Sequence, residues 1–232
     1  ARSVAVLAWP KIRHEEVKTG LLKSFMIAGH ANVLPVLNLG MLDSSKRVRD
    51  YADTYICEIS LQKFGEDKNA YQVWYQSTEG VPVEEVYRRS VHRIVETMKG
   101  VEPTVALEVL KQSHITTRSR YDQKGSVFES EGLAGLWLTW LEKEKLTSAQ
   151  MLEIAEFLKN SRLLEDENAE RALRLMKNHP SVDVRIATAS AVSEHSQKLV
   201  SAFLLELLES TIRSSDSGKP KAEPQKSNVM RS

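Results

Sequence analysis

The sequence predicts an all-α protein built from stacked helical hairpins. Residues 32–60 carry two apolar stripes at helical spacing, separated by the turn Asp43-Ser44-Ser45. A branched apolar residue followed by arginine recurs at Ile12-Arg13, Val48-Arg49 and Val184-Arg185. These pairs are 36 and 136 residues apart, which suits units of about 34 or about 45 residues, a range typical of helical-hairpin repeats.

The composition favours the same class. In 232 residues, 41% are hydrophobic, enough to bury a substantial core as one domain or as a stack of about five or six hairpins. Ten glycines and seven prolines are few for an all-β chain of this length, and no β-type alternation stands out. No stretch approaches the roughly 18 apolar residues that span a bilayer, so we expect no membrane span.

The N-terminal elements follow from apolar spacing. Residues 10–27 predict the second helix of a hairpin whose first helix is missing, which favours a fragment of a longer stack. Residues 33–42 and 48–59 form the clearest hairpin. The aromatic residues of 69–77 predict a short helix that packs over this hairpin.

The middle of the chain is marked by helix-end signals. Pro82 is expected at the first helical position, with acidic residues in the first turn, and this helix ends at Gly100. Residues 104–114 predict the next helix. Residues 116–131 are polar and contain glycine, so they form the longest expected internal loop.

Regular helices resume in the last third. Thr147 and Gln150 have the spacing of a capping box, which opens a helix over 151–158. The other expected helices are 133–144, 167–178, 180–194 and 199–212. We therefore expect one helical domain over 1–213, followed by a disordered basic tail over 214–232.

Charge is distributed unevenly. The formal net charge is +1, but residues 213–232 hold five basic residues against Asp216 and Glu223, so the first 212 residues carry about −2. A near-neutral body argues against a protein that wraps nucleic acid. The single Cys57 excludes an intramolecular disulfide and is interpreted as a small packing residue.

Two segments resemble HEAT-type repeats: LPVLNLGMLDSSKRVRDYADTYI and LRLMKNHPSVDVRIATASAV. The resemblance covers about 55 residues well and is poor over 80–164, where no Val-Arg pair occurs. It implies a right-handed α-α superhelix of the HEAT or armadillo-like class, with a plain helical bundle as the alternative. It also implies a structural ladder from unit to unit, formed by Asp43, Arg49, Asp183 and Arg185.

Signals of chemistry are sparse. The six histidines include no pair three or four residues apart, so we expect no metal site. The carboxylate pairs lie near predicted helix starts, where the helix dipole favours acids. Without a phosphate loop or nucleophile elbow, we expect no cofactor and no catalytic residue, and a non-enzymatic protein is favoured.

The best candidate binding surface is basic. It comprises Arg88, Arg89, His92, Arg93, Arg118, Arg120 and Tyr121. If the two groups project from one side, they could hold phosphates or an acidic partner segment. A solvated helix face is the alternative interpretation.

Three hypotheses for function follow. The first is a non-enzymatic protein-interaction or scaffold module that binds a protein or peptide partner on the extended face of the stack. The alternative is a nucleic-acid-binding, glycosylase-like HEAT protein that uses the basic surface around Arg88–Arg93 and Arg118–Arg120. The third is the C-terminal portion of a larger enzyme or scaffold. The sequence predicts neither a compartment nor an oligomeric state.

Overall fold

The computed structural model describes residues 4–28, 33–113, 127, 131–143, 145–160, 167–193, 201 and 205. Within these residues all regular structure is helical, so the predicted all-α class is confirmed. None of the described helices has the length and apolar character that crossing a membrane requires. The predicted tail 214–232, the predicted helix 199–212 except residues 201 and 205, and most of the predicted loop 116–131 lie outside the described residues.

The N-terminal half begins with a helix that the sequence did not predict. Its elements are α1 (Val4–Ala8), the 3₁₀ turn η1 (Trp9–Lys11), α2 (Glu15–Ala28), α3 (Val33–Met41), α4 (Lys46–Ser60) and α5 (Lys68–Thr78). Helix α1 packs against α3, so the prediction that no first helix precedes Pro10 is wrong. Ile12 is extended and Arg13 precedes α2, so Ile12-Arg13 does not open a helix as Val48-Arg49 does.

Helix α4 is closed at both ends by local contacts. The Ser45 hydroxyl accepts a hydrogen bond from the Val48 amide at 3.4 Å, as an N-cap residue does. At the other end Leu61 takes the left-handed conformation, with φ 56°, and its amide donates to the Cys57 carbonyl at 2.9 Å. The chain therefore leaves α4 sharply and turns toward α5.

A buried carboxylate holds the connection between α4 and α5. Asp53 is 4% exposed and accepts hydrogen bonds from the amides of Phe64, at 3.1 Å, and Gly65, at 3.2 Å. The Phe64 ring then packs edge-on against Tyr71 of α5, with centroids 5.6 Å apart. Tyr71 donates to Asn38 of α3 at 2.9 Å, so α5 is fastened over the hairpin of α3 and α4.

The C-terminal half is a second group of hairpins. It contains α6 (Val83–Lys99), α7 (Pro103–Gln112), α9 (Leu133–Glu142), α10 (Ser148–Asn160), α11 (Glu167–Lys177) and α12 (Val182–Ser193). Pro82 is the N-cap of α6. The prediction that it is the first helical residue is therefore wrong by one position. The capping box is confirmed: the Thr147 amide donates to Gln150 Oε1 at 2.7 Å, and the Gln150 amide to Thr147 Oγ1 at 3.3 Å.

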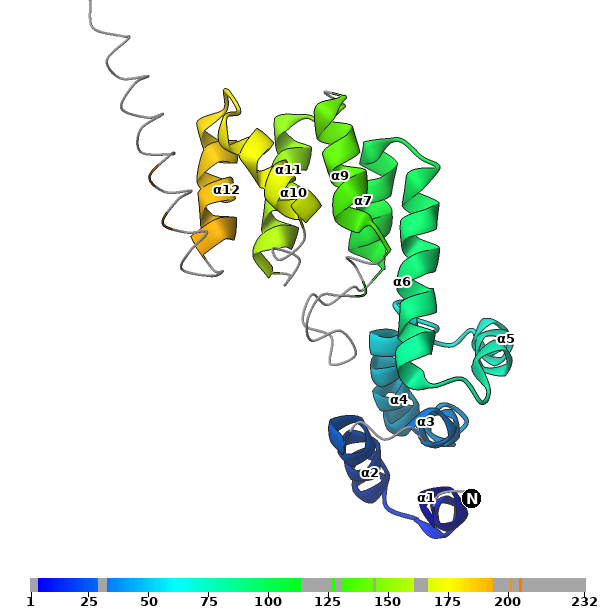
Figure 1. Cartoon of the computed structure of the whole chain (residues 1–232). Helices are drawn as coiled ribbons and strands as arrows, with labels where there is room; N and C mark the ends of the chain where they lie inside the picture. Colours follow the sequence, from blue (N-terminus) through cyan, green and yellow to red (C-terminus); the bar gives the residue numbers. More distant parts are fainter. Residues whose placement is uncertain are drawn as a thin grey trace, which may run out of the picture.

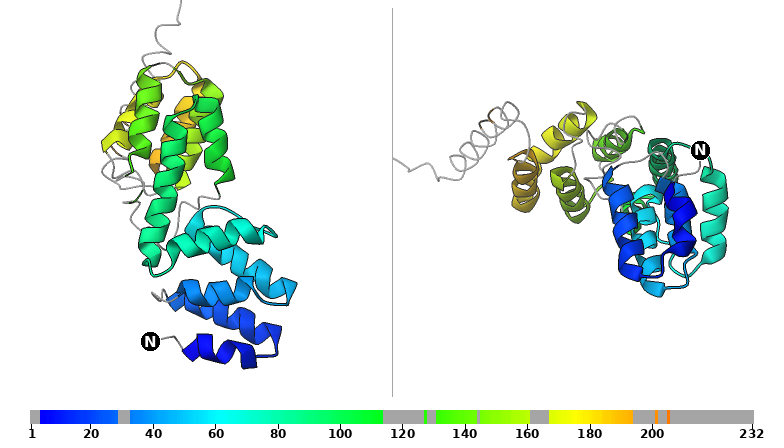
Figure 2. Two further views of the ribbon diagram at one scale, coloured as in Figure 1. Left: turned by 90° about the vertical axis from the view of Figure 1, so that its right-hand side faces the viewer. Right: turned by 90° about the horizontal axis from the view of Figure 1, so that it is seen from below.

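Helix α6 joins two hydrophobic cores. Helix α4 packs against α2 and α3 of the N-terminal half and also against α6. In the C-terminal half, α10 packs against α7 and α12, and α9 against α11. Val83 and Val86 of α6 belong to the N-terminal core, whereas Tyr87 and the apolar residues after it belong to the C-terminal core. In Figure 1, α6 runs from the N-terminal stack to the row of helices α7–α12, and Figure 2 shows the two groups from other sides.

Candidate functional site

The predicted basic surface is only partly described. Arg88, Arg89, His92 and Arg93 all lie on α6, as expected. Arg118, Arg120 and Tyr121 lie outside the described residues. Arg88, Arg89 and His92 contact two carboxylates, Glu85 and Glu131, which the sequence interpretation did not consider as partners.

Glu85, in the first turn of α6, pairs with two of the arginines. Its carboxylate accepts hydrogen bonds from Arg88 Nε at 2.8 Å, Arg88 Nη2 at 2.9 Å and Arg89 Nε at 2.8 Å. These bonds from Arg88 and Arg89 lower the pKa of Glu85 to about 2, so it is ionised at neutral pH. All three side chains are partly exposed, so the pairs matter less for stability than for cancelling charge.

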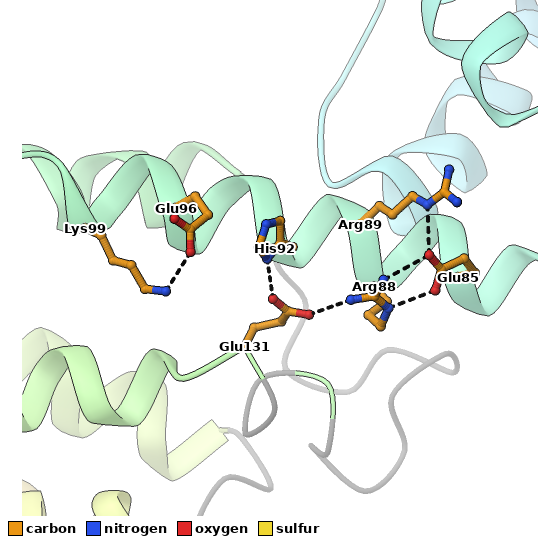
Figure 3. Close-up of polar contacts among 7 residues, drawn as sticks. All are labelled: Glu85, Arg88, Arg89, His92, Glu96, Lys99 and Glu131. Atoms are coloured by element: carbon orange, nitrogen blue, oxygen red, sulfur yellow. Dashed lines mark hydrogen bonds and ion pairs between the residues drawn. The ribbon is translucent and has the colours of Figure 1, made fainter.

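Glu131 supplies a second carboxylate from a distant part of the chain. It lies just before α9, and its side chain is only 9% exposed. Its Oε1 accepts from Arg88 Nη1 at 3.0 Å, and its Oε2 lies 2.5 Å from His92 Nδ1. Figure 3 shows these contacts along α6, together with the pair between Lys99 Nζ and Glu96 Oε1 at 2.6 Å. Basic and acidic groups therefore alternate on this side of α6.

Arg93 has a different environment from the other three. Its Nη1 donates to Gln62 Oε1 at 2.7 Å, and its Nη2 donates to the Ser60 carbonyl at 3.1 Å. Both acceptors are neutral, and no ion pair joins Arg93 to any described carboxylate. Burial lowers the pKa of Arg93. This guanidinium is thus partly desolvated and fixed by neutral groups at the end of α4.

Arg89 and Arg93 line a groove between α5 and α6. The groove has a volume of about 210 Å³, and its walls include Trp74 and Thr78 of α5 and Val86 of α6. The Trp74 ring packs against the Phe64 ring, with centroids 5.4 Å apart. For the aromatic residues of 69–77, the sequence interpretation favoured packing over a ligand platform. Trp74 also lines the groove. No signal in the sequence distinguishes it from the aromatic residues that only pack.

The hydroxyl groups of this groove are already engaged. Ser77 donates to the Trp74 carbonyl at 2.6 Å, Thr78 to the Tyr75 carbonyl at 2.9 Å, and Ser90 to the Val86 carbonyl at 2.9 Å. Each bond stays within one helix. The side-chain donors among the groove's lining residues that are not used within their own helix are therefore those of the two guanidinium groups and the indole N–H of Trp74.

A second cavity lies beside the turn between α3 and α4. It has a volume of about 270 Å³ and is lined by both signs of charge, including Lys46, Arg49, Asp50 and Glu66. Lys46 and Asp50 pair with each other at 2.7 Å. With Lys68, three basic residues line the cavity against the two acidic residues Asp50 and Glu66, so carboxylates in its own walls offset most of its positive charge.

The predicted structural residues of the first turn meet around Asp43. Arg49 Nη1 donates to the carbonyls of Asp43, at 2.8 Å, and Ser44, at 2.7 Å. The Asp43 carboxylate accepts from Trp9 Nε1 at 3.1 Å, Lys18 Nζ at 2.6 Å and the amide two residues on at 3.0 Å. Asp43 thus joins its own turn to η1 and α2.

The turn before α12 repeats the geometry of the turn before α4, but the residue in the place of Asp43 is not the predicted Asp183. Arg185 Nη1 donates to the carbonyls of His179 and Pro180, both at 2.9 Å. His179 Nδ1 accepts from the Ser181 amide at 3.1 Å. The residue in the place of Asp43 is therefore His179 and not Asp183, which lies on α12 two residues before Arg185.

Among the described residues, no group of three or more His, Cys, Asp or Glu side chains is arranged to hold a metal ion. Comparison of the chain with known protein families, with curated proteins and with solved structures finds no match in any of the three. The resemblance to HEAT-type repeats therefore stays a prediction.

Proposed function

We propose that the protein is a non-enzymatic protein-interaction module, a right-handed HEAT-like stack of hairpins that docks a partner in the groove between α5 and α6. The observation that supports this most is the placement of Trp74 beside Arg89 and Arg93 in one groove. Tryptophan and arginine are the side chains most enriched among interface residues that dominate binding energy. Trp74 is also held by Phe64, so little side-chain entropy is lost when a partner packs on it.

The arrangement of the helices supports the same proposal. Helix α5 is fastened to α3 through Tyr71 and Asn38, while α6 is built into both cores. The two walls of the groove are thus held by separate parts of the molecule. A docking surface on such supported helices needs little rearrangement when it binds.

The nucleic-acid alternative gains less support from this region. A protein that binds a phosphate backbone neutralises several phosphates with unpaired cations. On α6, however, Arg88 and Arg89 are paired with Glu85, and Arg88 and His92 contact Glu131. A phosphate chain at this surface would meet those two carboxylates.

Photo-crosslinking from the groove tests the proposal. A photoreactive phenylalanine analogue is placed at Ser77, which is exposed and lines the groove, and at the neighbouring Gln76 as the matched control, in cells of the source organism. We expect one polypeptide to crosslink from position 77, weakly from 76, and about tenfold less in Trp74→Ala. Mass spectrometry of the adducts identifies the partner.

Two results would contradict the proposal. Equal crosslinking from positions 76 and 77, or none from either, means that the groove is not a docking site. A mobility shift of a single-stranded or duplex oligonucleotide at low salt that Trp74→Ala abolishes supports the nucleic-acid alternative in its place.

A further inference from the structure

We propose that the α5–α6 groove selects an acidic peptide segment, in which an Asp or Glu side chain that binds Arg93 lies near a large apolar side chain that packs on Trp74. This inference rests on the proposed function, since it names the chemistry of the partner at the same site. Four observations support it.

The first is the donor capacity of Arg93. A guanidinium has five N–H donors in a planar fork that fits a carboxylate. The described contacts of Arg93 are one hydrogen bond to Gln62 and one to the Ser60 carbonyl. These two bonds hold the guanidinium in place at the end of α4 and leave further donors for a ligand that meets it in the groove.

The second is the charge balance of the groove. The side chains that line it include two arginines and no acidic residue. Glu85 lies outside the lining and pairs with Arg89, so of the two arginines that line the groove only Arg93 lacks an ion pair with a described carboxylate. The cavity beside Arg49 makes the contrast clear, because Asp50 and Glu66 are among its own walls. An anion that enters the α5–α6 groove supplies the negative charge that Asp50 and Glu66 provide in the other cavity.

The third is size. The groove measures about 210 Å³, below the roughly 300–1,000 Å³ typical of sites for drug-sized ligands and cofactors. A space of this size suits one or two side chains of a docked segment. Trp74 offers an aromatic surface to an apolar side chain, and Arg93 offers its fork to a carboxylate.

The fourth favours a peptide over a nucleic acid. One unpaired arginine can receive one anionic group, whereas a nucleic-acid strand presents a phosphate at every nucleotide. Beside the groove, α6 carries Glu85, and Glu131 lies next to it. These carboxylates repel successive phosphates and tolerate a peptide with an isolated acidic side chain.

The experiment is a selection from a phage-displayed library of random 12-residue peptides on the purified full chain, followed by fluorescence polarisation with synthetic peptides. We expect the selected peptides to share an Asp or Glu within a few positions of Leu, Phe or Trp. Replacing that acidic residue by Asn or Gln should weaken binding about tenfold or more, because the lost hydrogen bonds are charge-assisted.

Protein variants then assign the preference to Arg93. Arg93→Gln should bind the acidic peptide and its amide counterpart with nearly equal affinity, whereas Trp74→Ala should weaken both alike. The control is Arg174→Gln, an exposed arginine on α11 that pairs with Glu170, and it should keep the full preference. Circular dichroism melting checks that each variant is folded, and the Asp/Glu replacement in the peptide probes the charge without altering the protein.

The outcomes separate this inference from the proposed function. Peptides that need Trp74 but show no preference for an acidic residue overturn the inference and leave the docking groove standing. Selected peptides whose binding is unaffected by Trp74→Ala contradict the groove itself. Binding of a terminal carboxylate instead of an acidic side chain, seen when C-terminal amidation alone abolishes the interaction, also overturns the inference as stated.

Discussion

The turn before α4 and the turn before α12 share one structural device and differ in one residue. In each, an arginine at the fourth position of the helix donates to two backbone carbonyls of its own turn, at 2.7–2.9 Å. In each, the residue six positions before that arginine accepts a hydrogen bond from the backbone amide two residues on. That residue is Asp43 in the first turn and His179 in the second.

Asp43 and His179 differ in whether their side chains contact elements outside their own turn. Asp43 also binds Trp9 and Lys18, which belong to η1 and α2. The described partner of His179 is Ser181, in the same turn. The arginine therefore closes the turn in both places, and the residue six positions earlier determines whether the turn is also joined to the preceding hairpin.

The largest expected effect comes from removing Asp43. Asp43→Ala should lower the free energy of unfolding by about 3 kcal/mol, because the indole N–H, the Lys18 ammonium and a backbone amide lose a buried acceptor together. His179→Ala should cost about 1 kcal/mol, since one hydrogen bond is lost. Urea unfolding followed by circular dichroism measures both. Equal losses would show that Asp43 does not join the two hairpins.

A smaller and equal effect is expected from the two arginines. Arg49→Ala and Arg185→Ala should each cost about 1.5 kcal/mol, because each removes charge-assisted bonds to two carbonyls. Arg174→Ala is the control: its exposed pair with Glu170 should contribute less than about 0.5 kcal/mol. If one of the two arginines proves neutral in the same urea assay, the shared device does not operate in that turn.

The smallest effect is a difference in pH dependence. Burial raises the pKa of Asp43, but the bonds from Lys18 and from the Ser45 amide, the charge of Lys18 and the bond from Trp9 bring it below its ordinary 3.8. A lowered folded-state pKa contributes stability that is complete above 3.8 and is lost as the pH falls through the folded value.

Wild type should therefore lose stability more steeply than Asp43→Asn between about pH 5 and about pH 2. The measurement is the urea midpoint at each pH. Parallel curves for wild type and Asp43→Asn would mean that Asp43 titrates alike in the folded and unfolded chain.

The sequence predicted those features that depend on neighbouring residues. Apolar spacing located the hairpin of α3 and α4, and the offset between Thr147 and Gln150 gave a real capping box. Both depend on contacts within a few positions, where helix geometry links sequence to space.

Some of the features that escaped prediction depend on residues far apart in the chain, whereas the pairs of Glu85 with Arg88 and Arg89 were missed at helical spacing. The partners of Arg88 and His92 include Glu131, 43 and 39 residues away, so part of the predicted basic surface is paired with a carboxylate that no helical spacing relates to α6. The role of His179 was missed because Asp183 has the same side chain as Asp43. Asp183, however, lies two residues before its arginine, whereas Asp43 and His179 lie six residues before theirs. The groove beside Trp74 arises from two helices whose packing is set by other residues.

The division of α6 between two cores has a consequence for how the molecule comes apart. In a row of hairpins that touch only their neighbours, an end unit can open while the remainder stays folded. Here the first turn of α6 is anchored in one core and the rest in the other, so opening from either end meets a helix that the opposite half still holds.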